Sequence, residues 1–207
     1  MGLWSDRLLP RLTNRLLDVD AVRKARAQVC ADLTGDVVEL GFGSGLNVPH
    51  YPPTLGGVWA IDPSEVGLRL ACRRIRESPV RVVHAGFTAE TLPFPDGRFD
   101  CALSTFTLCT VPDVAQALRE LYRVLKPGGA FHFLEHGRAP DADVARWQDR
   151  LAPLNRAVAG GCHLTRDIGS LIRDAGLEID DYATYYGEGP RPFAYRYEGR
   201  ARRPAAS

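Results

Sequence analysis

The stretch "DVVELGFGSGLNVPHY" (36–51) places three glycines at alternate positions directly after a short apolar run. The run itself (36–40) is rich in β-branched residues and predicts a buried strand. Gly41, Gly43 and Gly45 follow, where the strand ends and a helix would begin. Without side chains there, a ligand can approach the main chain closely, and free N–H groups are available to its polar atoms. We therefore expect a small-molecule site at this junction.

The spacing of these glycines does not match two common nucleotide-binding motifs. A GxGxxG fingerprint needs glycine at the position that Leu46 occupies, and no Gly-Lys-Ser/Thr ending is present for a phosphate loop. Instead, Glu39 precedes a GxGxG pattern, and Asp62 stands at the end of the next predicted strand. A carboxylate at that point can accept hydrogen bonds from both ribose hydroxyls of an adenosine and would repel a 2′-phosphate. The pattern predicts an adenosine-type ligand.

Apolar runs alternate with helical periodicity through the first two-thirds of the chain. Four further runs predict strands at 57–61, 80–84, 99–106 and 130–136. One helix is expected to start near Ser64, and another has Asp113 as its N-cap. Near-continuous apolar strands joined by helices indicate a parallel sheet that is covered on both faces. The fold class is therefore α/β.

The last third of the chain has a different pattern. A longer helix carries Pro153 as a predicted kink, and another helix is expected from Thr165, with Gly176 just beyond its end. "LEIDDYATYY" (177–186) and "FAYRY" (193–197) then predict a hairpin of two strands. Aromatic residues in this hairpin either line an acceptor pocket or pack the sheet edge, and the pattern does not decide between the two.

Composition bounds the class of protein. The 207 residues are 45% apolar and 25% charged with a net charge of +1, which is typical of a soluble globular domain and predicts no nucleic-acid partner. Five widely spaced cysteines without a CxxC pair predict neither a disulfide framework nor a zinc site, and they fit a cytoplasmic location. No apolar stretch approaches the roughly 20 residues of a membrane span.

We expect one domain over residues 1–199, followed by a disordered basic tail over 200–207. Residues 1–34 are expected to form N-terminal helices that cap the ligand site as a lid. The first of these helices carries an apolar stripe (Trp4, Leu8, Leu12, Leu16) beside a basic one (Arg7, Arg11, Arg15). Such a helix could also make weak contact with an anionic membrane surface.

Three longer motifs add a family resemblance. "VVELGFGSG" (37–45), "AETLPFPDGRFD" (89–100) and "LRELYRVLKPGGAFHFLEH" (118–136) resemble segments of the class I methyltransferases that depend on S-adenosylmethionine (SAM), in their type 11 group. The resemblance implies a Rossmann-like, mostly parallel seven-stranded sheet with an antiparallel C-terminal hairpin at its edge. It also implies SAM as cofactor and S-adenosylhomocysteine as its product.

The same resemblance assigns the cofactor-binding residues, which are Glu39, Gly41, Gly43, Gly45, Asp62, Pro63, Thr88, Ala89, Glu90 and Thr105. By this assignment, Glu39 and the glycine loop meet the methionine moiety, and Asp62 binds the ribose beside a turn that Pro63 shapes. Residues 88–90 would lie near the adenine, although many members of the group have Asp where Thr88 stands. Thr105 opens a segment that faces the transferring methyl group in the family.

A narrower resemblance concerns the acceptor. "TLCTVPD" (107–113), "FHFLEH" (131–136) and "GCHLTRD" (161–167) are similar to the branch containing the animal thiol S-methyltransferases. Thiols suit a chain with few candidate bases, because a pKa of about 8.5 already leaves some thiolate at neutral pH. The candidate bases are His136 and His163. No metal is expected to assist.

The leading hypothesis is therefore SAM-dependent methylation of a small, fairly apolar acceptor, most readily a thiol. C- or O-methylation of a quinone-type or natural-product ring is the enzymatic alternative, because it is common in the type 11 group. A protein that binds SAM without catalysis is the third interpretation. The sequence leaves the oligomeric state open.

Overall fold

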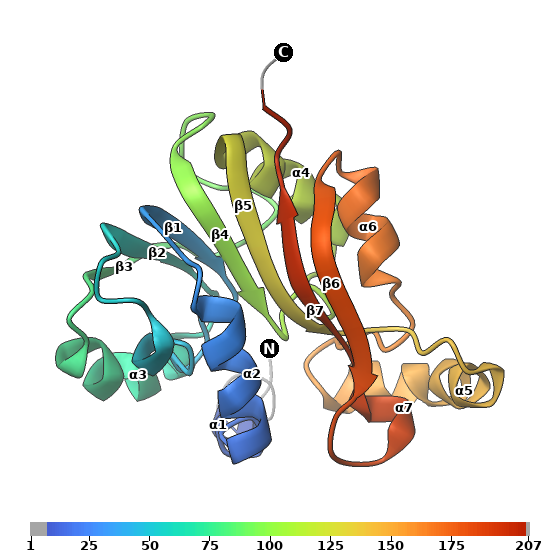
Figure 1. Cartoon of the computed structure of the whole chain (residues 1–207). Coiled ribbons are helices and arrows are strands. Elements are labelled where there is room, and N and C mark those ends of the chain that lie inside the picture. Colours follow the sequence, from blue (N-terminus) through green and yellow to red (C-terminus); the bar gives the residue numbers. More distant parts are fainter. Residues whose placement is uncertain (1–7, 206–207) are drawn as a thin grey trace.

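Seven strands form one mixed sheet in the computed structural model, which describes residues 8–205 (Figure 1). The strand order is β3-β2-β1-β4-β5-β7-β6. Neighbouring strands from β3 to β5 pair in parallel, and β7 pairs antiparallel with both β5 and β6. The strands are β1 Asp36–Leu40, β2 Gly57–Ile61, β3 Val82–Gly86, β4 Phe99–Thr105, β5 Leu125–His136, β6 Glu178–Tyr186 and β7 Tyr195–Arg202. This is the expected Rossmann-like architecture with an antiparallel C-terminal edge.

Helices cover both faces of the sheet. They are α1 Leu9–Leu16, α2 Asp20–Cys30, α3 Glu65–Glu77, α4 Val114–Val124, α5 Ala142–Val158, α6 Ile168–Asp174 and α7 Arg191–Ala194, with a 3₁₀ turn η2 at Val48–His50. Side chains alternate along the strands, so Val37 packs in the core beneath α2 and α3. Its neighbour Val38 packs in the opposite core, beneath α4 and α6. The central parallel strands β1 and β4 are thus buried on both faces, as is typical of parallel sheets.

Sequence patterns correctly predicted the bounds of two strands and the N-caps of two helices. Strands β1 and β2 have the bounds that their apolar runs predict. Ser64 caps α3, since its hydroxyl accepts the Gly67 N–H at 3.0 Å. Asp113 caps α4 in the same way, accepting the Gln116 N–H at 2.9 Å. These caps satisfy backbone donors that the first helical turn leaves free.

Two boundaries differ from the sequence prediction. β3 occupies 82–86 instead of 80–84, because Gly86 pairs with Ile61 across a register shift at the end of β2. Helix α6 begins at Ile168 instead of Thr165. Its N-cap is Asp167, whose carboxylate accepts both the N–H and the hydroxyl of Ser170 at 3.0 Å.

The C-terminal strand is longer than predicted. Residues 193 and 194 belong to α7, and β7 continues to Arg202, so the expected disordered tail is wrong for residues 200–202. Ala201 is completely buried, and Arg202 forms ion pairs with Glu178 and Asp180 of β6. The basic residues Arg200 and Arg202, which were expected in a disordered tail, form ion pairs with acidic residues of the neighbouring strand β6. Residues 206–207 lie outside the described part of the chain.

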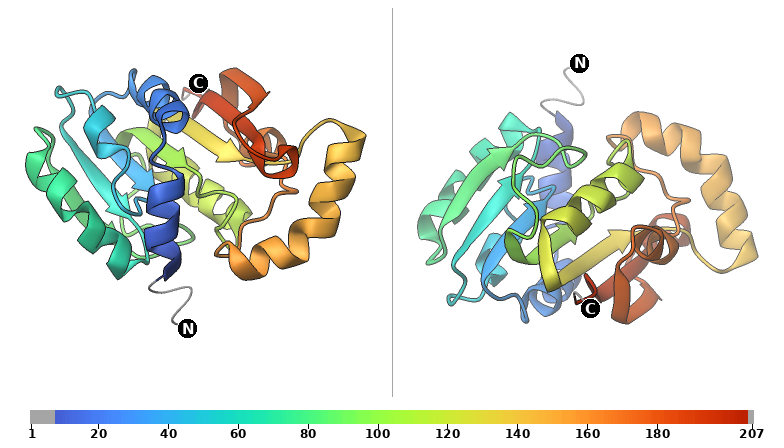
Figure 2. Two further views of the ribbon diagram at one scale, coloured as in Figure 1. Left: turned by 90° about the horizontal axis from the view of Figure 1, so that it is seen from below. Right: turned by 90° about the horizontal axis from the view of Figure 1, so that it is seen from above.

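The two N-terminal helices have different environments. Helix α2 packs on the sheet through a stripe that includes Val22 and Val29. Helix α1 has no buried residue and lies across the end of the sheet at which the parallel strands terminate (Figure 2, left). Trp4 and Arg7 of the predicted stripes lie outside the described residues. Over residues 8–205, each helix is too short or too polar to cross a bilayer.

Candidate functional site

A cavity of about 590 Å³ lies at the carboxyl ends of the parallel strands. Its size is within the range of small-molecule and cofactor sites, and its position is where open α/β sheets bind ligands. The wall comprises Thr13, Asn14, Leu17, Arg26, residues 41–44, Leu46, residues 61–63, residues 87–90, residues 105–107, residues 110–112 and Gly160. Eight of the predicted cofactor residues are among them, and Glu39 and Gly45 are not.

The glycine loop after β1 has left-handed backbone at all three glycines, and each glycine has a different reason to lack a side chain. A Cβ on Gly41 would lie 1.8 Å from the Thr107 hydroxyl oxygen, so this glycine lets the loops after β1 and β4 touch. A Cβ on Gly45 would press against Ala71 of α3 at 3.1 Å. A Cβ on Gly43 would meet no protein atom closer than 3.9 Å. Gly43 therefore leaves its space to the cavity.

Asp62 connects this loop to the end of β2. One carboxylate oxygen accepts the Gly43 N–H at 2.7 Å, and the other accepts the Ser64 N–H at 2.7 Å. Burial raises the pKa of Asp62, and the two backbone donors oppose that shift. Each oxygen keeps a second lone pair, so the carboxylate can still accept hydroxyl donors from a ligand in the cavity. Pro63 lies beside it in the cavity wall.

Glu39 lies behind the cavity wall. Its carboxylate is almost fully buried and accepts hydrogen bonds from the Asn47 amide, at 2.9 Å, and from the Tyr51 hydroxyl. Burial raises the pKa of Glu39 to about 7, and both donors act against that rise. In this structure Glu39 orients Asn47, whose amide also donates to the Thr105 hydroxyl at 2.9 Å.

Arg26 of α2 is a cavity residue that the sequence reading missed. Its Nη1 donates to the side-chain oxygen Oδ1 of Asn47 at 2.7 Å and to the Thr105 hydroxyl at 2.6 Å. The side chain is 4% exposed, its Nε has no hydrogen-bond partner within residues 8–205, and burial lowers the pKa of the guanidinium. The sequence feature that could have identified Arg26 is its place in the apolar stripe of α2, between Val22 and Val29. Such a buried cation fits an anionic ligand group.

The predicted adenine segment lines another side of the cavity. Thr88, Ala89 and Glu90 are all in the wall, and Ala89 is buried. The Thr88 hydroxyl donates to the Glu90 carboxylate, and the Glu90 N–H returns a bond to that hydroxyl at 3.3 Å. Thr88 and Glu90 thus stabilise the local conformation of the loop that lines the cavity.

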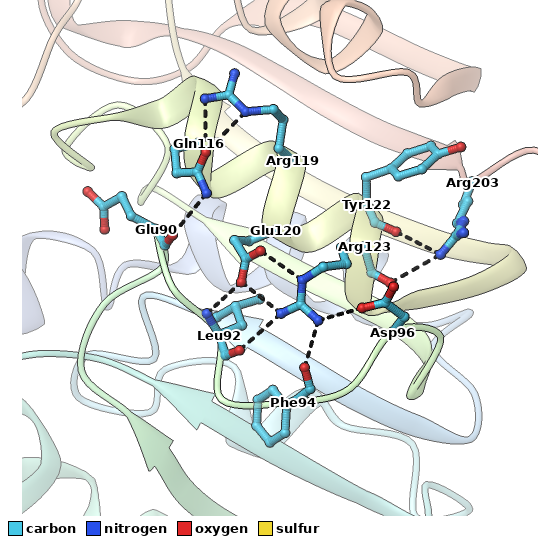
Figure 3. Close-up of polar contacts among 10 residues, drawn as sticks. All are labelled: Glu90, Leu92, Phe94, Asp96, Gln116, Arg119, Glu120, Tyr122, Arg123 and Arg203. Carbon is cyan, nitrogen blue, oxygen red and sulfur yellow. Dashed lines mark hydrogen bonds and ion pairs between the residues drawn. The ribbon is translucent and has the colours of Figure 1, made fainter.

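Arg123 of α4 holds the continuation of this segment in place (Figure 3). Its guanidinium donates to the carbonyls of Leu92, at 3.1 Å, and Phe94, at 2.7 Å. It also forms ion pairs with Asp96 and Glu120, each at 2.8 Å. Glu120 accepts the Leu92 N–H at 2.8 Å in return. The loop after residue 90 is therefore held against α4 by Arg123 and Glu120.

The loop after β4 forms the opposite wall. Phe106 has a positive φ of 55°, unusual for a bulky residue, and its N–H is bonded to the Leu134 carbonyl at 2.8 Å. Glu135 is fully buried and accepts the Ser104 hydroxyl at 2.7 Å and the Thr107 N–H at 2.9 Å. Burial raises the pKa of Glu135 to about 7. These bonds fix the strained loop and place the Phe106 ring in the cavity wall.

Neither candidate base lines the cavity. The His136 ring lies behind Phe106, with ring centroids 4.6 Å apart. The backbone N–H of His163 donates to the Cys109 carbonyl at 2.7 Å. Desolvation, and next the charge of nearby Arg166, lower the pKa of the His163 imidazole. The roles of both histidines as bases stay predictions.

Instead, His136 joins two of the cysteines. The ligand atoms of Cys109, His136 and Cys162 lie within 4.8 Å of one another. Hydrogen bonds from the Cys109 thiol and from His136 lower the pKa of Cys162. A cluster of metal-binding residue types could not be expected from the sequence, because these three residues are far apart along the chain. The structure brings them together.

The strand order and helix placement are those of the Rossmann-like fold of class I methyltransferases, and the comparisons with known proteins agree with this fold. Residues 38–133 belong to the family described as "Methyltransferase domain". The chain is 36% identical over 147 residues to a thiol S-methyltransferase, TMT1A, of Homo sapiens, an alignment that covers 68% of this chain and 59% of that protein. It is 34% identical over 185 residues to the ubiquinone/menaquinone biosynthesis C-methyltransferase UbiE of Escherichia coli, covering 88% of this chain and 65% of that one.

The chain therefore spans about three-fifths of the length of the curated relatives that it matches. Among solved structures, a methyltransferase from Bacillus halodurans, named as putative, superposes with a TM-score of 0.69 at 19% identity, covering 88% of this chain and 99% of that one. At that identity the likeness concerns the fold alone. It supports the architecture of the sheet and its helices.

Proposed function

We propose that this protein is a SAM-dependent methyltransferase whose acceptor is a small, fairly apolar thiol. The observation that carries the proposal is the cavity, which has the glycine loop and Asp62 on one wall and the strained loop around Phe106 on the other. The first wall suits an adenosine-containing cofactor. The wall around Phe106 would contact the acceptor, which would lie next to the cofactor.

The residues of the cavity fit SAM part by part. Asp62 would accept the ribose hydroxyls, and Gly43 would let the cofactor approach the main chain. Arg26, whose buried Nε lacks a partner, would pair with the carboxylate of the methionine moiety. Residues 88–90 would contact the adenine. When bound, the cofactor supplies a methyl group on a positively charged sulfur.

The chain's own task in such a transfer is alignment and the exclusion of water. An in-line displacement gains most from holding donor and acceptor in the reacting geometry. The wall residues Phe106 and Thr107 are held by bonds from β5, so they present a rigid, partly apolar surface to the acceptor. A thiol needs less base catalysis than an alcohol, which suits a cavity whose wall contains no histidine among the described residues.

A second candidate is C-methylation of a quinone-type ring. The similarity to the Escherichia coli C-methyltransferase supports it, because that alignment extends over more of this chain than the alignment with the thiol enzyme. A flat ring could stack on Phe106, where the acceptor wall is aromatic. The thiol is preferred because the identity to TMT1A is slightly higher.

The test is a panel of acceptors. Purified protein is incubated with SAM and separate sets of alkyl thiols, phenols, quinols and amines, and methylated product and S-adenosylhomocysteine are measured by mass spectrometry. Turnover is expected on apolar thiols. Turnover on quinols or phenols alone would reject the thiol. If no set yields S-adenosylhomocysteine while the cofactor still binds, the protein binds SAM without catalysis.

A further inference from the structure

A second group of reactive side chains lies beside the cavity and outside its wall. It consists of Cys109 from the loop after β4, His136 from the end of β5 and Cys162 from the loop after α5. We call this trio the thiol–imidazole cluster. Cys109 is 2% exposed and Cys162 8%, so both sulfurs are shielded from bulk water.

We propose that the thiol–imidazole cluster binds one Zn²⁺ ion and that the acceptor thiol is the fourth ligand of this ion. The second half of the proposal rests on the function proposed above. The first half stands on the cluster alone.

The separations suit zinc. Zn²⁺ bonds thiolate sulfur at about 2.3 Å and imidazole nitrogen at about 2.0–2.1 Å, so tetrahedral ligand atoms lie roughly 3.5–3.8 Å apart. The three atoms of the cluster are all within 4.8 Å. To bind an ion, the three ligand atoms would therefore move by about 1 Å, which side-chain rotation can supply. Two sulfurs and one nitrogen favour zinc over the oxygen-seeking Mg²⁺ and Ca²⁺.

With three protein ligands, a tetrahedral zinc ion in the cluster would have one coordination position left for another molecule. Over residues 8–205, no fourth cysteine, histidine or acidic side chain joins the three ligand atoms. Structural zinc sites have four protein ligands, whereas sites with three keep one position for an exogenous molecule. The cluster follows the second pattern.

Neighbouring bonds hold the ligands in place, as supporting residues do around metal sites. The buried Asn155 amide donates to the Cys162 carbonyl at 2.8 Å. The Cys109 carbonyl accepts the backbone N–H of His163 at 2.7 Å. These bonds hold the backbone of the two cysteines in place, and the ligand atoms move by rotation of their side chains.

The cluster borders the acceptor side of the cavity. The His136 ring packs on Phe106, which is in the cavity wall. Thr110 follows Cys109 directly, and Gly160 precedes Cys162 by two residues, and both also line the cavity. The acceptor side of the cavity wall and the cluster are therefore built from the same short segments of chain.

The chemistry balances without a further reactant. The acceptor thiol gives its proton to solvent and binds Zn²⁺ as a thiolate, which remains nucleophilic at neutral pH. Its sulfur forms a bond to the methyl carbon while the carbon–sulfur bond of the sulfonium breaks, and that electron pair stays on S-adenosylhomocysteine. The neutral thioether is a poor zinc ligand, so the product leaves.

Cobalt titration tests the metal site without any turnover. Reduced protein freed of metal by a chelator is titrated with Co²⁺, and absorption is followed for thiolate-to-cobalt charge transfer and tetrahedral bands. We expect one Co²⁺ per chain, displaced by one Zn²⁺. Cys162→Ser and His136→Asn should each weaken Co²⁺ binding at least 100-fold, and the exposed Cys72→Ser should not. Folded wild-type protein without charge-transfer absorption would overturn the proposal, whether or not the variants fold.

A second arm tests the fourth ligand. Adding an apolar alkyl thiol to the Co²⁺ form should change the tetrahedral bands, and the matching alcohol should not. An unchanged spectrum with thiol would overturn the acceptor's place on the metal. If chelator-treated protein still methylates thiols at the full rate, the zinc role fails while the proposed function stands. If Co²⁺ binds as expected but no thiol is methylated, the proposed function fails and the metal site stands.

Discussion

Replacing Gly43 with alanine tests the cofactor site without disturbing the protein core. The new Cβ would have no protein atom nearer than 3.9 Å, so the methyl group occupies ligand space. Overfilling a packed site by about one methylene costs about 1–3 kcal/mol, which corresponds to a roughly 5- to 150-fold loss of affinity. The positive φ of 54° adds about 1–2 kcal/mol of backbone strain, and Tm falls by about 2–8 °C.

The matched control is Gly128→Ala. Gly128 also has a positive φ, 79°, and nothing lies within 4 Å of its would-be Cβ, but it is absent from the cavity wall. Both variants should lose similar Tm by scanning fluorimetry, and only Gly43→Ala should lose affinity for S-adenosylhomocysteine by calorimetry. A dissociation constant for Gly43→Ala within twofold of the wild type would refute the placement of the cofactor along this loop.

Three further predictions concern buried or clamping side chains. Arg26→Met should weaken S-adenosylhomocysteine about 10- to 150-fold, the loss of a hydrogen bond to a charged group. The same change should leave 5′-methylthioadenosine, which lacks the carboxylate, within about threefold by calorimetry; equal losses for both ligands would contradict the carboxylate role. Arg123→Met should lower the unfolding free energy in urea by about 1–3 kcal/mol, because carbonyls of a partly buried loop lose their donors. Arg119→Met is the control, since that guanidinium bonds only Gln116 among the hydrogen bonds drawn in Figure 3, and an equal loss there would argue against the clamp. His132 is buried, and its pKa is lowered to about 4 by desolvation, so the folded state favours the neutral ring. Its contribution to stability is full above the unfolded pKa of about 6.5 and falls by roughly 3 kcal/mol as the pH drops to about 4. Urea unfolding across that range should show this extra loss in the wild type relative to His132→Phe, and parallel curves would disprove it.

Features set by neighbouring residues could be predicted from the sequence. The bounds of β1 and β2 follow from apolar runs that end in turn-forming residues. The caps at Ser64 and Asp113 follow from side chains that reach only three residues ahead. The glycine loop and Asp62 meet because each ends one of two adjacent parallel strands.

Features set by distant residues could not be predicted. Arg26 reaches Thr105, 79 positions away, only because α2 packs over the sheet. The strand identity of residues 200–202 depends on acidic partners in β6 that no local pattern reveals. Cys109, His136 and Cys162 come from three segments, so their spacing resembles no metal motif. Tertiary packing decides each of these cases.

Helix α1 contributes Thr13 and Asn14 to the cavity wall and yet buries none of its residues. Eight residues are too few to stay helical by themselves in water. Its order must therefore come from what it rests on, including the Asn14 and Asp18 contacts to Arg74. A ligand in the cavity would contact α1 and so add to the packing that keeps this helix ordered. Binding and release of the ligand would then be coupled to the folding and unfolding of α1.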